Sequence, residues 1–93
     1  MSVFRGTVTG SISGMPYNIA STIKSWYLTN NTGGSITVNV SLVNNLTGEA
    51  TKIFNRDIAA NESVSDEVEI IMPYGWTLYI ATSGSLDYWF SIV

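Results

Sequence analysis

The stretch that decides the fold is YLTNNTGGSITVNVSLVNN, residues 27–45. From position 36 to 42 its side chains alternate, with Ile, Val, Val and Leu at the even positions and Thr, Asn and Ser between them. A period of two is typical of a β-strand that buries one face, because successive side chains point to opposite sides. The run NNTGG before it, residues 30–34, consists of residues that favour turns. This stretch therefore predicts a turn followed by a half-buried strand.

The same two signals continue outward along the chain in both directions. Further turn clusters of Gly, Pro, Asn and Ser occur at residues 14–16, 44–48, 59–63, 73–75 and 83–85. No segment has the period of an amphipathic helix. We expect strands over residues 3–13, 19–29, 35–44, 50–58, 64–72, 76–82 and 86–93. The chain is therefore predicted to be all-β, a single small antiparallel β-sandwich of jelly-roll or Ig-like type with about seven to eight strands.

Alternation also assigns each side chain of an expected strand to an inward or an outward face. The inward residues expected after the opening stretch are Val64, Val68, Ile70, Met72, Trp76, Leu78, Ile80, Leu86, Tyr88, Phe90 and Ile92. Large apolar side chains also fall on outward positions, which favours a second buried surface, most simply a contact between subunits. A closed barrel or a covering loop would hide them as well. The candidate contact residues are Trp26, Tyr27, Tyr79, Trp89 and Val93.

Length and composition limit the class of protein. We expect one domain over residues 1–93, in which residues 1–14 can serve as an arm that exchanges with, or adds to, a neighbouring sheet. Apolar residues make up 45% of the chain and charged residues 12%. Since charged residues usually make up about 25%, this composition suits a protein whose surface is largely covered by partners.

The balance of charges argues against two classes of partner. The net charge is −3, and the chain has four cationic side chains. Nucleic-acid binding needs several cations on one face, and so does attraction to an anionic membrane surface. No apolar stretch approaches the roughly 20 residues that span a bilayer. We therefore expect neither a nucleic-acid partner nor a membrane partner.

The residues that most enzymes use are missing or poorly placed. The chain has no histidine and no cysteine, which excludes Ser-His triads, thiolate nucleophiles and disulfides. The acidic run DEVE at residues 66–69 predicts a solvated strand face rather than a carboxylate pair or a calcium site, because calcium needs about six to eight oxygens. We therefore expect no enzymatic activity, no catalytic residue, no cofactor and no metal ion.

Cysteine usage and the N-terminus suggest where the chain folds. A small secreted domain commonly depends on disulfides. The first six residues, MSVFRG, lack the basic and apolar regions of a signal peptide. We expect folding in the cytoplasm, a partner that completes the core, or both.

The aromatic residues leave a second kind of function open. A flat ring can stack on the apolar face of a sugar, so a carbohydrate-binding module is an alternative. The candidates for its platform are Trp26, Tyr27, Trp76, Tyr79 and Trp89. Trp26 and Trp76 are most simply core residues, as are Met15 and Met72.

Three segments carry a resemblance to a known family. They read YLTNNTGGSITVNVSLV (27–43), IFNRDIAANESVSDEVEIIMPYGWTLYIATS (53–83) and LDYWFSIV (86–93). Their order of strands and turns resembles a small β-sandwich found in the virions of tailed bacteriophages, and the resemblance covers residues 25–93.

This resemblance implies a virion structural protein without enzymatic activity. The expected role is capsid decoration or cementing, with a tail or fibre accessory role as the alternative. The implied partners are further copies of the chain, with a trimer as the expected state, and the major capsid protein or a tail protein. The implied location is the virion, reached after folding in the host cytoplasm.

Overall fold

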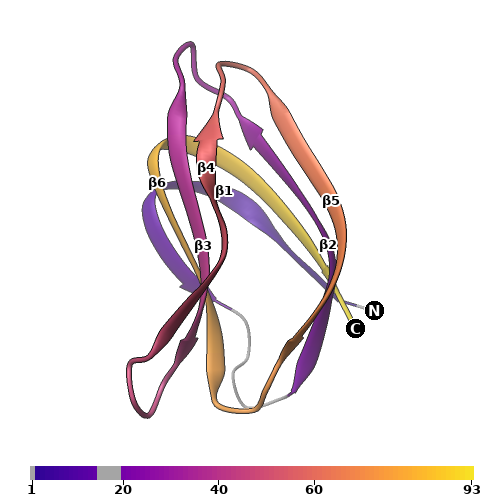
Figure 1. The fold of residues 1–93 in the computed structure, drawn as a ribbon. Coiled ribbons are helices and arrows are strands. Elements are labelled where there is room, and N and C mark those ends of the chain that lie inside the picture. The colour runs from indigo at the N-terminus through magenta and orange to yellow at the C-terminus, as the bar shows by residue number, and fades with distance from the viewer. Residues whose placement is uncertain (1, 15–19) are drawn as a thin grey trace.

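The computed structural model describes residues 2–14 and 20–93, and these residues form antiparallel strands joined by short turns (Figure 1). The strands are β1 (Ser2–Gly14), β2 (Ser21–Asn30), β3 (Ile36–Asn44), β4 (Ala50–Ile58), β5 (Ser63–Met72) and β6 (Trp76–Ile92). The prediction of an all-β antiparallel fold is confirmed. The turn expected at residues 15 and 16, the strand start expected at residue 19, and Met15 lie outside the described residues.

The six strands form one sheet that curls into a half-barrel. Its order is β4-β3-β6-β2-β5, and β1 pairs with β6 on the other side. The first part of β6, residues 76–82, pairs with β3, while residues 86–92 pair with β2. Two subsheets therefore share β6 and β1. We call them the β4 subsheet (β4, β3 and the start of β6) and the β5 subsheet (β5, β2 and the end of β6).

The strand count differs from the prediction at residues 83–85. These residues were expected to form a turn between two strands, but β6 continues through them for 17 residues. At this point β6 leaves β3 and joins β2, while β1 bridges both parts with a register shift between Val8 and Gly10. Gly84 has no room for a side chain, since an added Cβ would lie 2.6 Å from Cγ2 of Ile36. The Ser-Gly-Ser signal therefore marks a bend within a strand rather than its end.

The other predicted turns fall between strands. Residues 30–34, 44–48, 59–63 and 73–75 coincide with the ends and connections of β2 to β6. Gly48, Asn61 and Gly75 have positive φ angles there, as expected for turn residues. Gly10 also has a positive φ, +96°, and lies at the irregularity of β1, where such a backbone favours glycine.

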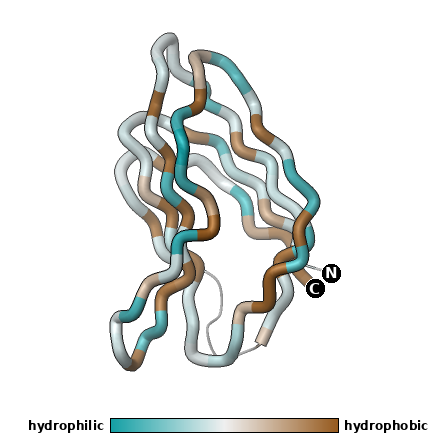
Figure 2. The backbone as a smooth tube through the Cα atoms, in the orientation of Figure 1, coloured by the Kyte–Doolittle hydropathy of each residue, from teal (hydrophilic) through white to brown (hydrophobic). Residues whose placement is uncertain are grey.

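The core lies between the two subsheets. All four apolar residues of the opening stretch are buried, as is the inward set of residues 86–92. Hydrophobic and hydrophilic residues alternate along the strands (Figure 2). Trp26 of the β5 subsheet meets Phe54 of the β4 subsheet with ring centroids 5.9 Å apart in an edge-to-face arrangement. Val68, Ile70 and Trp76 are partly buried and pack against this core. The inward assignments from alternation are therefore confirmed.

An irregularity in β2 explains why both of its faces looked apolar in the sequence. The register with β6 shifts between Ile23 and Ser25, so that Lys24 is an extra residue of β2 in that pairing. Ile23 and Trp26, which lie an odd number of positions apart, both face the core with exposed fractions of 0% and 5%. Tyr27 is left on the outer face.

Candidate functional site

The exposed large apolar side chains are concentrated on one surface. Among the described residues they are Val3, Tyr27, Leu46, Ile71, Tyr74, Trp89 and Val93. Leu46 and Tyr74 lie in turns. The other five lie on the outer side of the β5 subsheet and the start of β1, because their chain neighbours face the core. We call this surface the apolar face.

Two aromatic residues are cross-strand neighbours near the middle of the apolar face. Tyr27 of β2 is the direct cross-strand partner of Trp89 of β6. They are 51% and 41% exposed, and we refer to them as the aromatic pair. On the other side of Trp89, its β1 partner Arg5 places Cζ 5.3 Å from the centre of the indole. This cation–π contact restricts the orientation of the Trp89 ring.

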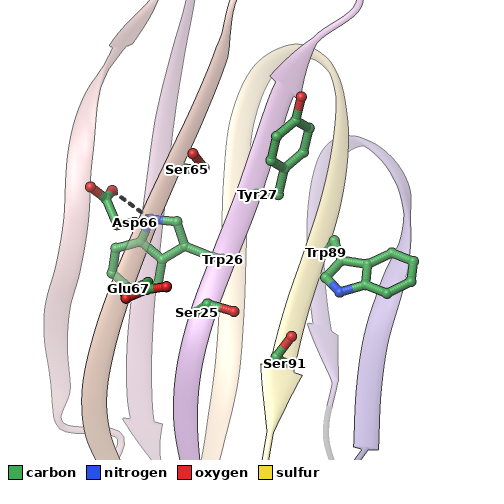
Figure 3. A pocket seen from close by; sticks show the side chains of 8 residues that line it. All are labelled: Ser25, Trp26, Tyr27, Ser65, Asp66, Glu67, Trp89 and Ser91. Carbon is green, nitrogen blue, oxygen red and sulfur yellow. Dashed lines mark hydrogen bonds between the residues drawn. The ribbon is translucent and has the colours of Figure 1, made fainter.

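A depression of about 290 Å³ lies beside the aromatic pair (Figure 3). It is lined by both rings and by the serines at positions 25, 65 and 91. Ser25 and Ser91 lie on the same strands as Tyr27 and Trp89, two residues further along the sheet face. Small side chains at these positions leave the space open, and Glu67 of β5 adds a carboxylate to the lining.

Aliphatic side chains gather at the end of the apolar face where the chain ends. Val93 exchanges two backbone hydrogen bonds of 2.9 Å with Thr22, which in turn pairs with Ile71 of β5. Val3 pairs with Ser91 on the opposite side of β6. Val3, Ile71 and Val93 are 43%, 69% and 64% exposed, and we call them the aliphatic patch.

Three of the charged groups near the depression are already engaged. The Lys24 ammonium donates a 2.6 Å hydrogen bond to Oε1 of Glu69, and this contact lowers the pKa of Glu69 from its ordinary value. Nε1 of Trp26 donates to Oδ2 of Asp66 over 2.9 Å. The lining of the depression therefore has acceptor character without a free cation.

The structure separates the five candidate contact residues. Tyr27, Trp89 and Val93 come together on the apolar face. Trp26 is 5% exposed and belongs to the core, so it is not available at the surface as a contact residue. Tyr79 is half-buried on the outer side of the β4 subsheet, opposite Ser41 and away from the other three.

Two residues of the apolar face were missed in the sequence. Ile71 lies between the inward residues Ile70 and Met72, so strict alternation already placed it outside. Val3 has the same kind of signal, but its strand pairs with β6 from the far end of the chain. Neither residue stood out without knowledge of its cross-strand neighbours.

Two other kinds of feature are absent from the described ranges, 2–14 and 20–93. No three acidic side chains come together there as a group that could hold a metal ion. No helix in the same ranges is long and apolar enough to cross a membrane.

No protein-family model and no curated protein sequence matches the chain. Solved structures do resemble it. PirA matches with a TM-score of 0.60 and 14% identity, over 97% of this chain and 90% of PirA. At this identity the likeness shows the fold alone.

Two weaker matches have TM-scores below 0.5 and support no further inference. A chain of infectious bursal disease virus Gx strain matches with a TM-score of 0.47 and 12% identity, over 97% of this chain and 28% of that one. The CBM22-1–GH10 modules of Clostridium thermocellum endo-1,4-β-D-xylanase 10B, complexed with xylohexaose, match with a TM-score of 0.38 and 24% identity. That match covers 81% of this chain and 16% of the xylanase chain.

Proposed function

We propose that the chain is a structural protein of a bacteriophage virion, without enzymatic activity, that decorates and stabilises the capsid. It acts by burying the aliphatic patch against further copies of itself, in a trimer, and against the major capsid protein. The tail is the alternative location, with a tail protein as partner. The phage origin rests on the sequence resemblance of residues 25–93.

The observation that carries this proposal is the concentration of exposed apolar side chains on one face. Isolated exposed apolar side chains are normal on a monomer, whereas a contiguous set marks a contact surface. Val3, Ile71 and Val93 have no polar side-chain atom, so only the removal of their surface from water stabilises a contact there. Each Å² of apolar area buried contributes about 25 cal/mol.

The rigidity of the fold supports this role. The aliphatic patch is presented by β1, β5 and the residue after β6, all held in one hydrogen-bonded sheet. A surface fixed in this way loses little conformational entropy when a partner covers it. The low share of charged residues, 12%, also reduces the cost of removing the surface from water.

Light scattering after size exclusion tests the association. We expect the wild-type chain to form a defined oligomer at micromolar concentration, and the double variant Ile71→Ser/Val93→Ser to shift toward the monomer. Leu46→Ser is the matched control, because Leu46 is 93% exposed but lies in a turn. A sharp monomer peak for the wild type, or equal shifts in the double variant and the control, would contradict the proposal.

Gene order separates the two locations in the virion. A major capsid gene next to the gene for this chain favours decoration of the capsid. A neighbouring tape-measure or baseplate gene favours the tail.

A further inference from the structure

We propose that the depression beside the aromatic pair binds a short stretch of a neutral carbohydrate, so that the chain has a glycan-binding function in addition to its structural role. The depression adjoins the aliphatic patch, because Ser91 of its lining is the cross-strand partner of Val3, but none of the three patch residues belongs to the lining. The two sites use different residues, so separate substitutions can alter each of them.

The first reason is the combination of rings and hydroxyl groups. Binding sites for small ligands combine apolar and aromatic lining with a few well-placed polar groups. Here Tyr27 and Trp89 supply exposed ring surface, on which the C–H face of a sugar ring can rest. The hydroxyls of the lining serines, at positions 25, 65 and 91, make no side-chain hydrogen bond to any described residue. Each can donate to and accept from a sugar hydroxyl.

The second reason concerns charge. The lining contains the acidic residues Asp66 and Glu67, and no Lys or Arg of the described chain belongs to it. Lys24 is held by Glu69, and Arg5 lies over Trp89 from the β1 side. An anionic ligand would be repelled by the carboxylates, whereas a neutral sugar can donate a hydroxyl hydrogen bond to Glu67.

The third reason is that the platform is formed in advance. The two ring-bearing residues are direct partners in the β2–β6 pairing, so the sheet fixes their spacing. Arg5 further restricts Trp89 from the side away from the depression. A volume of about 290 Å³ is at the lower end of ligand sites, which suits a few sugar units bound weakly on an open surface.

Calorimetric titration of the full chain tests the inference. The neutral probes are maltohexaose, cellohexaose, mannohexaose and chitohexaose, and the acidic probe is hexagalacturonic acid. We expect at least one neutral probe to bind and the acidic probe not to bind. Trp89→Ala should weaken neutral binding at least about tenfold, since it removes a stacking surface. Trp89→Phe, which keeps a ring, should weaken it less. Tyr74→Ala, which removes an exposed turn tyrosine, should leave it unchanged.

A charge variant adds an independent readout. Glu67→Gln should allow the acidic probe to bind, because it removes repulsion, and should weaken neutral binding less than Trp89→Ala does, because the amide still accepts a hydrogen bond without the charge. The inference is overturned if no neutral probe binds, if the acidic probe binds the wild type as well as a neutral one does, or if folded Trp89→Ala binds like the wild type. Ile71→Ser/Val93→Ser should keep sugar binding, so failure of the association proposal and failure of this one are distinguishable.

Discussion

Replacing Asn30 should reveal how much the first turn after β2 contributes to stability. Asn30 is fully buried at the end of β2. Its Nδ2 donates to the backbone oxygens of Gly34, Ile58 and Ala59 over 2.8, 2.9 and 3.0 Å. Its Oδ1 accepts from N and Oγ1 of Thr32 over 2.9 and 2.7 Å. One side chain therefore ties the β2–β3 turn to the end of β4.

The size of the effect follows from this network. Nδ2 carries two hydrogens, so the five contacts correspond to about four full hydrogen bonds. At about 1 kcal/mol net for each, Asn30→Ala should cost about 4 kcal/mol, out of a total of about 5–15 kcal/mol for a small domain. The buried carbonyls left without a donor account for much of that loss.

The isosteric variant Asn30→Asp gives a pH-dependent signature. Its carboxylate would face three carbonyl oxygens, which raises its pKa in the folded state above the unfolded value of about 3.9. A carboxyl group whose pKa is higher in the folded than in the unfolded state contributes stability that is fully present below its unfolded-state pKa. That contribution is lost as the pH rises through the folded-state pKa. The deficit of this variant relative to the wild type should therefore grow from about pH 3 to pH 7.

Urea unfolding followed by tryptophan fluorescence, to which buried Trp26 contributes, measures these free energies of unfolding. If Asn30→Ala does not fold, Thr32→Val provides a milder test. It removes the bonds from Oγ1 of Thr32 to Asn30 and Gly34, for an expected loss of about 1–2 kcal/mol. A loss below about 1 kcal/mol for Asn30→Ala, or a pH-independent deficit for Asn30→Asp, would refute this reasoning.

Three further predictions concern the sheet and its titrating groups. Gly84→Ala should destabilise the fold by about 1–3 kcal/mol, because the new methyl group would lie 2.6 Å from Ile36. Adding Ile36→Ala should recover part of this loss. If the two losses simply add in the double variant, this clash is excluded as the cause. In Lys24→Gln, the pKa of Glu69 measured by NMR should rise to its ordinary value. In the wild type, the contact between Lys24 and Glu69 should be lost as pH falls through the lowered pKa. An unchanged pKa in the variant would exclude Lys24 as the cause of the lowering. Burial raises the pKa of Tyr88 above its ordinary value, so the free energy of unfolding should fall as pH rises above about 10. The fall should be less steep in Tyr88→Phe. Equal dependence on alkaline pH in the two proteins would argue against a contribution from Tyr88.

The candidate site shows why single residues could be named from the sequence while their grouping could not. Tyr27, Trp89 and Val93 were recognised as apolar residues in outward or ambiguous positions, and all three lie on the apolar face. Trp26 had the same appearance, but the extra residue of β2 in its pairing with β6 places Trp26 in the core. A bulge reverses the inward and outward positions that follow it, and no local signal in β2 announced one.

The sequence by itself determined the class of fold, most of the turns and the buried face of each regular strand. These features are local, since the alternation of side chains and the backbone preferences of Gly, Asn and Pro act within a few residues. The tertiary structure alone decided that β6 runs unbroken through residues 83–85 and that the apolar face is shared by residues from both ends of the chain. Val3 meets Ser91, and Tyr27 meets Trp89, through pairing between segments distant in sequence. That pairing depends on how whole strands bury their apolar sides together, which no short segment specifies.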